Sequence, residues 1–212
     1  FSQKNLIELI DKMILSNILF GVHLLEYAKK HNIKYFINTS SYSQSIDNIS
    51  YNPQNFYAST KQAFEDILKF YTECNILKSI TLSLFDVYGP DDARPKFINL
   101  LINALNKNDV FNMSKGDQNI RYVYIDDVTD AYCIAINLIQ TDSFNKSATY
   151  SIYGNENLTL KQLVAYFCDV TGNNLKTNPG FYPYRDNEIM FCKPRYDKLP
   201  NWSPKINLEE GI

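Results

Sequence analysis

A tyrosine and a lysine stand four residues apart in the stretch "NFYASTKQAFE", which begins at Asn55 and has the pattern of a helix start. In a helix, Tyr57 and Lys61 project from the same face, one turn apart. A free tyrosine has a pKa of roughly 10. A lysine ammonium within about 4–6 Å lowers that pKa, because it favours the phenolate. Such a pair can protonate an alkoxide while hydride reaches carbon, which is the chemistry of ketone reduction, or run the reverse alcohol oxidation.

A second hydroxyl, holding the carbonyl oxygen, would complete such a site. The preceding stretch "INTSS" supplies Thr39, Ser40 and Ser41. Ligands of open α/β sheets bind at the carboxyl ends of parallel strands, so these hydroxyls need a strand before them. Taken alone, the spacing is more often structural than catalytic, since it recurs by chance in many helices and Ser/Thr clusters commonly open loops. The flanking elements therefore decide between the two interpretations.

The elements expected on either side of the Tyr57–Lys61 helix are strands. "IKYFINTSS" and "SITLSLFDVYGP" are short apolar runs typical of buried strands, and the helix expected from about Tyr57 to Glu73 lies between them. Strand, helix and strand without a hairpin turn imply a right-handed crossover in a parallel sheet. A helix, or two in tandem, is expected from Asn5 to Lys30. The sequence predicts an α/β fold with a doubly wound parallel sheet.

The second half of the chain also alternates between helices and strands. We expect helices in "KFINLLINALNK", "DDVTDAYCIAINLI" and "TLKQLVAYFCDVTG", and strands in "IRYVYI" and "ATYSIYG". Asp126 is the expected N-cap of the second of these helices. Thr159 and Gln162 occupy capping-box positions in the third, and Gly172 is its expected stop. A last helix is expected to begin near Asn207.

Two domains are expected. Residues 1–90 would form the later part of a dinucleotide-binding domain, and residues 91–212 a smaller mixed α/β substrate lobe from which about 121–153 return to the sheet. The length of 212 residues and the 45% hydrophobic content suit a globular fold of this size.

Composition excludes several functions. The net charge of −2 offers no basic field for a nucleic acid backbone. No apolar run approaches the ~20 residues that span a bilayer, and the first residues lack the plan of a signal peptide. The four cysteines have no metal-binding spacing, which indicates reduced thiols and a cytoplasmic protein.

A set of linked motifs points to a family. "INTSS", "YASTK", "LFDVYGP", "NIRYVYIDDVTDAY", "YRDNEIMF" and "NWSPKINLEEGI" occur in an order that resembles the extended short-chain dehydrogenase/reductase family acting on nucleotide sugars. The resemblance covers essentially the whole chain. Within the family, "YRDNEIMF" and "VYGPDDARPKFINLLINALNK" are most similar to CDP-abequose synthases, which reduce a CDP-linked 4-keto-3,6-dideoxyhexose in the synthesis of surface polysaccharide (O-antigen) precursors.

The resemblance assigns roles at the chemical centre. It implies that Tyr57 is the acid/base and that Lys61 also holds the ribose of a nicotinamide cofactor, NAD(P), with NADPH favoured. Ser40 aligns best with the catalytic Ser/Thr, and Thr39 and Ser41 are close enough to leave that choice open. Asn17, in "LSNILFGVHLLE", matches the asparagine of a helix that supports the active site, although a solvated helix residue would look the same.

The family resemblance also assigns residues that contact the nucleotide sugar. Arg121 and Arg185 match guanidiniums that hold the diphosphate, and the bidentate fork of arginine suits phosphate oxygens. The alternative is a surface ion pair. Lys96 and Phe97 begin a segment that lines the nucleotide pocket, although Phe97 could equally be core. Asp86 stands where relatives often have Asn or His, and it could bind a sugar hydroxyl or cap a turn.

One family element is not found. The glycine-rich cofactor loop that opens the family has no counterpart among the seven glycines, and the chain begins with Phe1 near the family's fourth helix. We expect these residues to be part of a longer polypeptide and to bind no dinucleotide alone. Without further strands, "IKYFINT" would present an unpaired edge and an uncovered sheet face.

Three functions remain open at this stage. Reduction of a nucleotide-linked 4-keto-deoxysugar, with a CDP-sugar favoured, is the first. A nucleotide-sugar 4-epimerase would use the same residues, and a truncated sugar-nucleotide-binding module would use none of them for catalysis. Ser41 and Tyr42 replace the acid pair of dehydratases, which argues against elimination of water. The family resemblance also implies a homodimer formed through the helices at Asn5–Lys30 and Tyr57–Glu73.

Overall fold

The chain was analysed as a computed structural model that describes residues 3–212, with the side chains described from residue 7 on. It divides into two compact units, and each is described by itself. The first comprises the residues up to Leu84, Asp130–Ile152 and Pro194–Trp202. The second comprises Phe85–Thr129, Tyr153–Lys193 and Ser203–Ile212. The predicted boundary near residue 90 thus lies at residue 84 in the structure, and a late segment also joins the first unit.

The first unit is built on a parallel sheet. Its strands are β1 (Tyr35–Ser41), β2 (Lys78–Leu84) and β7 (Ser147–Ile152), in the order β1-β2-β7. Both pairings are parallel, with Ser40 opposite Ser83 and Ser83 opposite Ser151. The predicted parallel α/β fold is confirmed. Five of the seven residues of β2 are buried, and they alternate between the apolar Ile80 and Leu82 and the small polar residues Ser79, Thr81 and Ser83.

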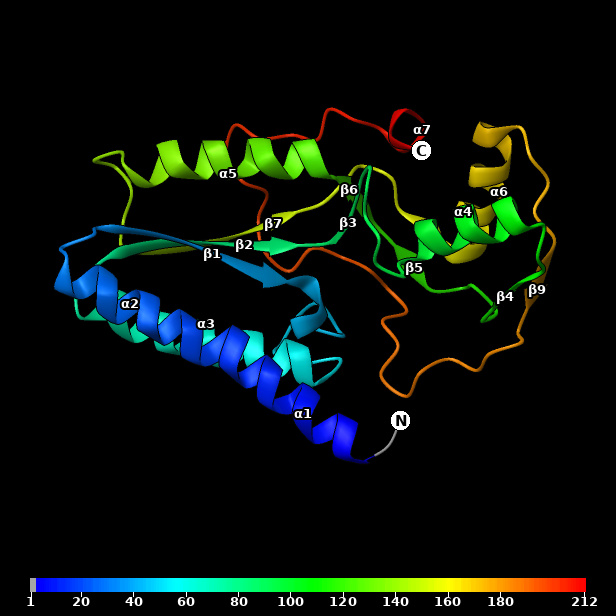
Figure 1. Ribbon diagram of the computed structural model, residues 1–212. Coiled ribbons are helices and arrows are strands. Elements are labelled where there is room, and N and C mark those ends of the chain that lie inside the picture. The colour runs from blue at the N-terminus through cyan, green and yellow to red at the C-terminus, as the bar shows by residue number, and fades with distance from the viewer. Residues whose placement is uncertain (1–2) are drawn as a thin grey trace. The chain divides into compact units, whose positions relative to one another are not determined.

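Helices cover both faces of this sheet (Figure 1). The helix α3 (Phe56–Glu73) connects β1 to β2 and lies with α2 (Phe20–Lys30) on one side, while α5 (Ile125–Ile139) lies on the other. Coverage of β1 is incomplete, since Tyr35 is 43% exposed and Ile37 is half-buried, so the prediction of an uncovered face holds in part. Among the described residues, β1 pairs only with β2, so the predicted unpaired edge is present.

The N-terminal segment is one continuous helical path. It consists of α1 (Gln3–Ile14), a π-helical turn η1 (Leu15–Leu19) and α2. At Gly21 the path approaches α3 so closely that a Cβ atom would lie 2.2 Å from the ring of Phe64. The glycine is therefore required by packing rather than by its backbone conformation. Leu25 and Ala28 of α2 continue this contact into a buried cluster with Phe64.

The second unit is a smaller mixed α/β lobe. Its strand pairs are short, and its helices cover a common apolar core. The parallel pairs are β3 (Asp86–Tyr88) with β6 (Tyr122–Tyr124), and β4 (Phe111–Met113) with β9 (Thr177–Pro179); β5 (Asn119–Ile120) and β8 (Leu158–Thr159) are antiparallel. Its helices are α4 (Phe97–Lys107), α6 (Leu160–Thr171) and α7 (Leu208–Gly211).

Local signals in this lobe are mostly confirmed. The side chains of Thr159 and Gln162 form the predicted capping box of α6, and Gly172 ends that helix with φ of 64°. Asn207 caps α7. The prediction for Asp126 is wrong: α5 begins at Ile125, so Asp126 lies inside its first turn.

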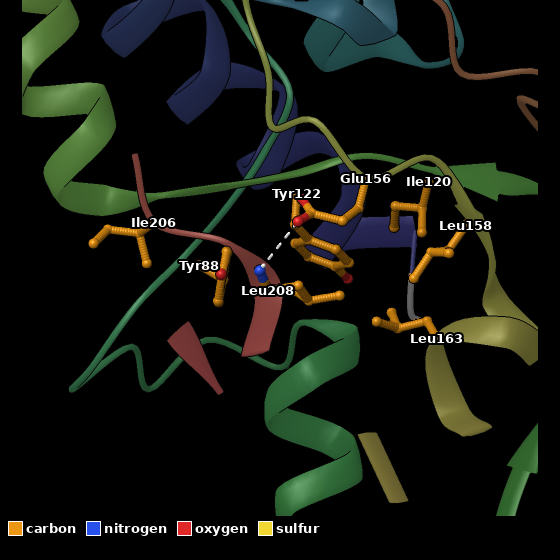
Figure 2. Close-up of a pocket in the computed structure, with 8 residues that line it drawn as sticks. All are labelled: Tyr88, Ile120, Tyr122, Glu156, Leu158, Leu163, Ile206 and Leu208. Carbon is orange, nitrogen blue, oxygen red and sulfur yellow. Dashed lines mark hydrogen bonds between the residues drawn. The ribbon is translucent and has the colours of Figure 1, made fainter. Parts of the chain in front are cut away.

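A small internal cavity lies in the core of the second unit (Figure 2). Its volume is about 10 Å³, and Tyr88, Tyr122 and Leu163 are among the residues around it. Across it, the carboxylate of Glu156 accepts a hydrogen bond of 3.4 Å from the backbone N–H of Leu208, drawn as a dashed line. A space of this size holds a single water molecule at most, so it is a packing feature and not a ligand site.

Candidate active site

Tyr57 and Lys61 occupy the first turns of α3. The side chain of Asn55 starts this helix by accepting a hydrogen bond of 2.9 Å from the backbone N–H of Ala58. The side chain of Tyr57 is exposed and that of Lys61 is half-buried. Within residues 7–212, neither the phenol of Tyr57 nor the ammonium of Lys61 makes a hydrogen bond to protein. Both polar ends are therefore available to a ligand.

Burial controls the titration of this pair. It raises the pKa of Tyr57 above its ordinary value, and it lowers the pKa of Lys61, an effect that the carboxylate of Glu65 partly offsets. Burial alone accounts for the raised pKa of Tyr57, so its direction is opposite to the predicted one. Tyr57 therefore holds its proton at neutral pH.

The first two hydroxyls of "TSS" face opposite sides of β1, as strand geometry requires. Thr39 Oγ1 hydrogen-bonds to the hydroxyl of Tyr132 on α5. Ser40 is buried and turned towards α3, where its hydroxyl donates to carboxylate and amide oxygens of Glu65 and Gln44. Both hydroxyls are thus committed to protein partners on the two faces of the sheet.

Ser41, the last residue of β1, is only half-buried. Its hydroxyl lies 2.8 Å from that of Ser43 and accepts the backbone N–H of Ser43 at 3.3 Å. These contacts cap the short 3₁₀ turn η2 (Tyr42–Gln44) that follows the strand. A serine hydroxyl has one proton and two lone pairs, so these contacts still leave capacity for a ligand.

Asn17 lies in the π-helical turn η1 and contacts α3, the helix that carries Tyr57 and Lys61. Its side-chain amide donates a 2.9 Å hydrogen bond to the hydroxyl of Thr60, which donates at 2.8 Å to the backbone carbonyl of Tyr57. Thr60 directly precedes Lys61. The asparagine is therefore attached to the turn that carries the tyrosine and lysine, and π-turns occur often at functional sites.

The second unit contains an open pocket of about 760 Å³ beside α4 and β4. Phe97, Phe111 and Tyr182 contribute aromatic rings to it, and the first two pack edge to face with centroids 5.4 Å apart. Arg185 and Glu188 contribute charge. Apolar walls with a few charged groups, at this volume, suit a ligand of nucleotide size.

The other predicted binding residues lie outside the lining of this pocket. Arg121 donates to the backbone carbonyls of Cys192 and Gly154, each at 3.3 Å, and its guanidinium lies 5.3 Å from the ring centre of Tyr153. Its Nη2 group makes no hydrogen bond within the described part of the chain. Arg121 thus stabilises its own loops and retains free donors.

Lys96 and Asp86 are close enough to influence each other. The ammonium of Lys96 donates a 3.0 Å hydrogen bond to the carbonyl of Val87. Burial lowers the pKa of Lys96, and the carboxylate of Asp86 opposes that change. Asp86 lies at the start of β3, opposite Tyr122 of β6.

The sequence analysis did not name several residues that contact the hydroxyls of β1 or line the pocket. Glu65 lies four residues beyond Lys61 at helical spacing, a signal that was visible in "YASTKQAFE". Gln44 stands three residues after Ser41, a capping-box spacing that was visible in the sequence and is formed in the structure. The contact between Tyr132 and Thr39 follows from no local pattern. Glu188 and Tyr182 line the pocket from a loop without regular structure.

The described residues offer neither a metal site nor a membrane-spanning helix. Among the described residues no cluster of His, Cys, Asp and Glu could hold a metal ion, and all four cysteines are free. Across the same part of the chain, no helix has the length and apolar character needed to cross a membrane.

Comparison with known proteins assigns the family. Residues 4–152 match the NAD dependent epimerase/dehydratase family. The chain belongs to this family. It is 32% identical over 192 residues to a CDP-abequose synthase of Yersinia pseudotuberculosis, covering 89% of this chain and 65% of that protein. A CDP-abequose synthase of Salmonella typhimurium is 28% identical over 203 residues, covering 93% of this chain and 67% of that protein. The chain thus spans about two thirds of the length of these relatives.

Solved structures agree on the fold. The UDP-N-acetylglucosamine 4-epimerase from Methanobrevibacter ruminantium, in complex with UDP-N-acetylmuramic acid, superposes with a TM-score of 0.78 at 20% identity, covering 93% of this chain and 66% of its own. MoeE5 in complex with UDP-glucose and NAD gives a TM-score of 0.80 at 20% identity, covering 93% of this chain and 69% of its own. The predicted incomplete Rossmann-like fold is therefore confirmed.

Proposed function

We propose that the polypeptide to which these residues belong reduces a nucleotide-linked 4-keto-deoxysugar with NAD(P)H, and that Tyr57 protonates the oxygen at C4. The observation that carries the proposal is the unpartnered Tyr57–Lys61 pair on α3, the helix that follows the hydroxyl-bearing end of β1. The CDP-abequose synthases among its relatives support the choice of reaction. CDP is accordingly the proposed nucleotide.

The raised pKa of Tyr57 suits this direction of reaction. A tyrosine that keeps its proton at neutral pH is ready to act as an acid. The phenolate left after proton transfer is stabilised by the ammonium of Lys61 on the same helix face. The lysine therefore acts on the deprotonated state, after the proton has moved, rather than on the resting tyrosine.

The residues fit a nicotinamide cofactor in part. The half-buried Lys61 ammonium has no hydrogen-bond partner within the described residues, which matches a group that holds ribose hydroxyls. Tyr57 lies beside it, and Asn17 supports their turn through Thr60. A bound NAD(P)H supplies the hydride for the reduction. We propose NADPH as the preferred form, and initial rates with the two reduced cofactors would test that choice.

Among the three hydroxyls, we favour Ser41 as the group that holds the C4 oxygen. The family resemblance favoured Ser40, but it is 5% exposed and hydrogen-bonded to Glu65 and Gln44. Thr39 is bonded to Tyr132. Ser41 is the only one of the three at the end of the strand, where ligands of parallel sheets bind.

The nucleotide is proposed to occupy the pocket of the second unit. Phe97 offers a ring for the base, and Arg185 offers a guanidinium for the diphosphate. Arg121, through its free Nη2 group, is proposed as a second diphosphate ligand. Lys96 and Asp86 are proposed to contact the sugar and ribose hydroxyls.

We further propose a cytoplasmic homodimer that makes precursors of surface polysaccharide. Phe20, Leu19 and Leu24 on the N-terminal helices are 60%, 42% and 41% exposed. Phe70 of α3 is 61% exposed. Large apolar side chains that are exposed on helices are typical of association surfaces.

One experiment separates the candidate functions. The polypeptide encoded by the gene would be incubated with CDP-, dTDP-, UDP- and GDP-linked 4-keto sugars while the absorbance of reduced nicotinamide is followed. Net consumption supports the reductase. Inversion of the sugar without net consumption would show a 4-epimerase, which needs the same residues. Binding without either reaction would leave a non-catalytic sugar-nucleotide-binding module.

A further inference from the structure

A buried polar network joins the end of β1 to α3. At its centre is the side-chain amide of Gln44, which is 4% exposed. Its carbonyl oxygen accepts the backbone N–H of Ser41 at 3.2 Å and the hydroxyl of Ser40. Its NH₂ group donates to Gln62 at 2.9 Å and to Glu65 at 3.2 Å. Both hydrogens of this amide are used, and its oxygen accepts the N–H of Ser41 and shares the single hydroxyl proton of Ser40 with Glu65, which determines its orientation.

Glu65 is the point at which this network meets the helix of the active site. Its carboxylate accepts from both Gln44 and Ser40. Positions 57, 61 and 65 are successive turns of one face of α3, so the anchor and the proposed acid lie on a single rigid element. The electrostatic attraction between Glu65 and Lys61 agrees with this placement.

The network therefore determines where Ser41 lies. Its N–H is held by Gln44, and Gln44 is held by Glu65. We propose that Glu65, acting through Gln44, is a positioning residue that fixes the hydroxyl of Ser41 relative to the Tyr57–Lys61 face of α3. This inference rests on the proposed function, because it assigns Ser41 and Tyr57 to one reacting centre.

Removal of the carboxylate tests the proposal. In Glu65→Ala the amide of Gln44 loses a buried acceptor, the turn after β1 shifts, and kcat is expected to fall ~10–100-fold, the cost of misplacing a reacting group by about an ångström. KM for the nucleotide sugar should change less than about twofold, because binding energy common to ground and transition states is retained. Glu73→Ala is the matched control, since the exposed carboxylate of Glu73, near the end of the same helix, lies 3.7 Å from Lys146 and outside this network.

A conservative variant separates hydrogen bonding from charge. Glu65→Gln keeps an acceptor for Ser40 and Gln44 but removes the negative charge near Lys61, and it should retain kcat within about threefold of the parent. Equal loss in Glu65→Gln and Glu65→Ala would overturn the proposal in favour of an electrostatic role. Gln44→Ala should reproduce the loss, and the double variant should be no worse than either single one, since the two residues form one pathway.

Hydrogen exchange supplies a readout that does not need turnover. Amide exchange in the peptide that contains residues 40–44 should be faster in Glu65→Ala than in the parent, and unchanged in Glu73→Ala. Unchanged exchange in folded Glu65→Ala, or an unchanged kcat, would overturn the inference. If the parent turned over no nucleotide sugar, the proposed function would fail, and the exchange result would still decide whether Glu65 fixes the turn. Should Glu65→Ala not fold, Gln44→Ala provides the same two measurements.

Discussion

At the scale of single residues, the chemistry depends on which side chains remain free. Many polar groups of the first unit are hydrogen-bonded within the chain, whereas Tyr57 and Lys61 have open polar ends. Ser40, which the sequence favoured, is bonded on the inner side of the strand, and Ser41 is half-exposed beyond it. Exposure, together with open polar ends, is therefore the basis on which Tyr57, Lys61 and Ser41 are proposed to meet a substrate.

Replacement of Tyr57 by phenylalanine tests the acid directly. The ring and its packing remain while the proton donor is lost, so kcat should fall by ~10²–10⁴, the usual contribution of a positioned acid. Turnover would be followed by absorbance of the reduced cofactor, with the melting temperature as a check of folding. Tyr51→Phe, which alters a tyrosine that is 45% exposed in the loop before α3, is the control. Full activity in Tyr57→Phe would contradict the assignment.

Replacement of Arg185 by alanine tests whether this residue binds the diphosphate. Loss of a charge-assisted hydrogen bond costs about 1.5–3 kcal/mol, so Arg185→Ala should raise KM for the sugar nucleotide roughly 10–100-fold. The protein fold should be unaffected, because Arg185 is exposed. Arg94→Ala removes an exposed guanidinium already paired with Asp92 at 2.7 Å and should leave KM unchanged. Similar KM values in the two variants would argue against the pocket.

Glu65 should also affect the dependence of stability on pH. Burial raises its pKa above the ordinary value of 4.5, an effect that Lys61 opposes and Asp66 reinforces. Between 4.5 and the raised pKa, the folded protein binds more protons than the unfolded chain, so stability falls as pH rises through this window. Gln at position 65 does not titrate. The melting temperature of Glu65→Gln minus that of the parent should therefore increase from pH 4.5 towards neutrality; a constant difference would contradict the shift.

At the scale of elements, the packing of α2 against α3 depends on Gly21. A methyl group there would lie 2.2 Å from the ring of Phe64. Alanine would gain ~1 kcal/mol of helix propensity, but overpacking costs ~1–3 kcal/mol and should dominate at so short a distance. Gly21→Ala is expected to lower the free energy of unfolding in denaturant titrations. Adding Phe64→Leu should recover part of the loss, and Ser16→Ala on the exposed side should be neutral.

The sequence predicted most elements because their signals are local. Alternation of strand and helix identified the parallel crossover, and the cap residues Thr159 and Gly172 were read correctly. The prediction of Asp126 as an N-cap was wrong because α5 begins directly after β6, without an intervening cap residue. The choice between Ser40 and Ser41 could not be made from sequence, since it depends on which face of β1 receives α3. Of the pocket lining, only Phe97 and Arg185 were named from the sequence, through the family resemblance, because the other lining residues come from distant segments without a local signal.

At the scale of the whole molecule, association is the property that can be tested. Phe20, 60% exposed on α2, belongs to the proposed dimer surface. A buried charge there would lack a partner, so Phe20→Glu should shift the protein to monomers in light scattering after size-exclusion chromatography. Ile136→Glu, which changes a residue 47% exposed on α5, should leave the dimer intact. A monomeric parent, or dissociation by both variants, would contradict this interface.

The π-helical turn η1 has a consequence for sequence alignment and for chain length. A π-turn accommodates one residue more than an α-turn in the same axial path, so Leu15–Leu19 has the form of a single-residue insertion into a longer helix. Deleting one residue beside Asn17 would restore regular α-helix while rotating the asparagine away from Thr60. A relative that lacks this residue should therefore show a one-position gap at η1. If the gap were ignored in the alignment, every helical position before it would be assigned to a helix face rotated by about a quarter of a turn.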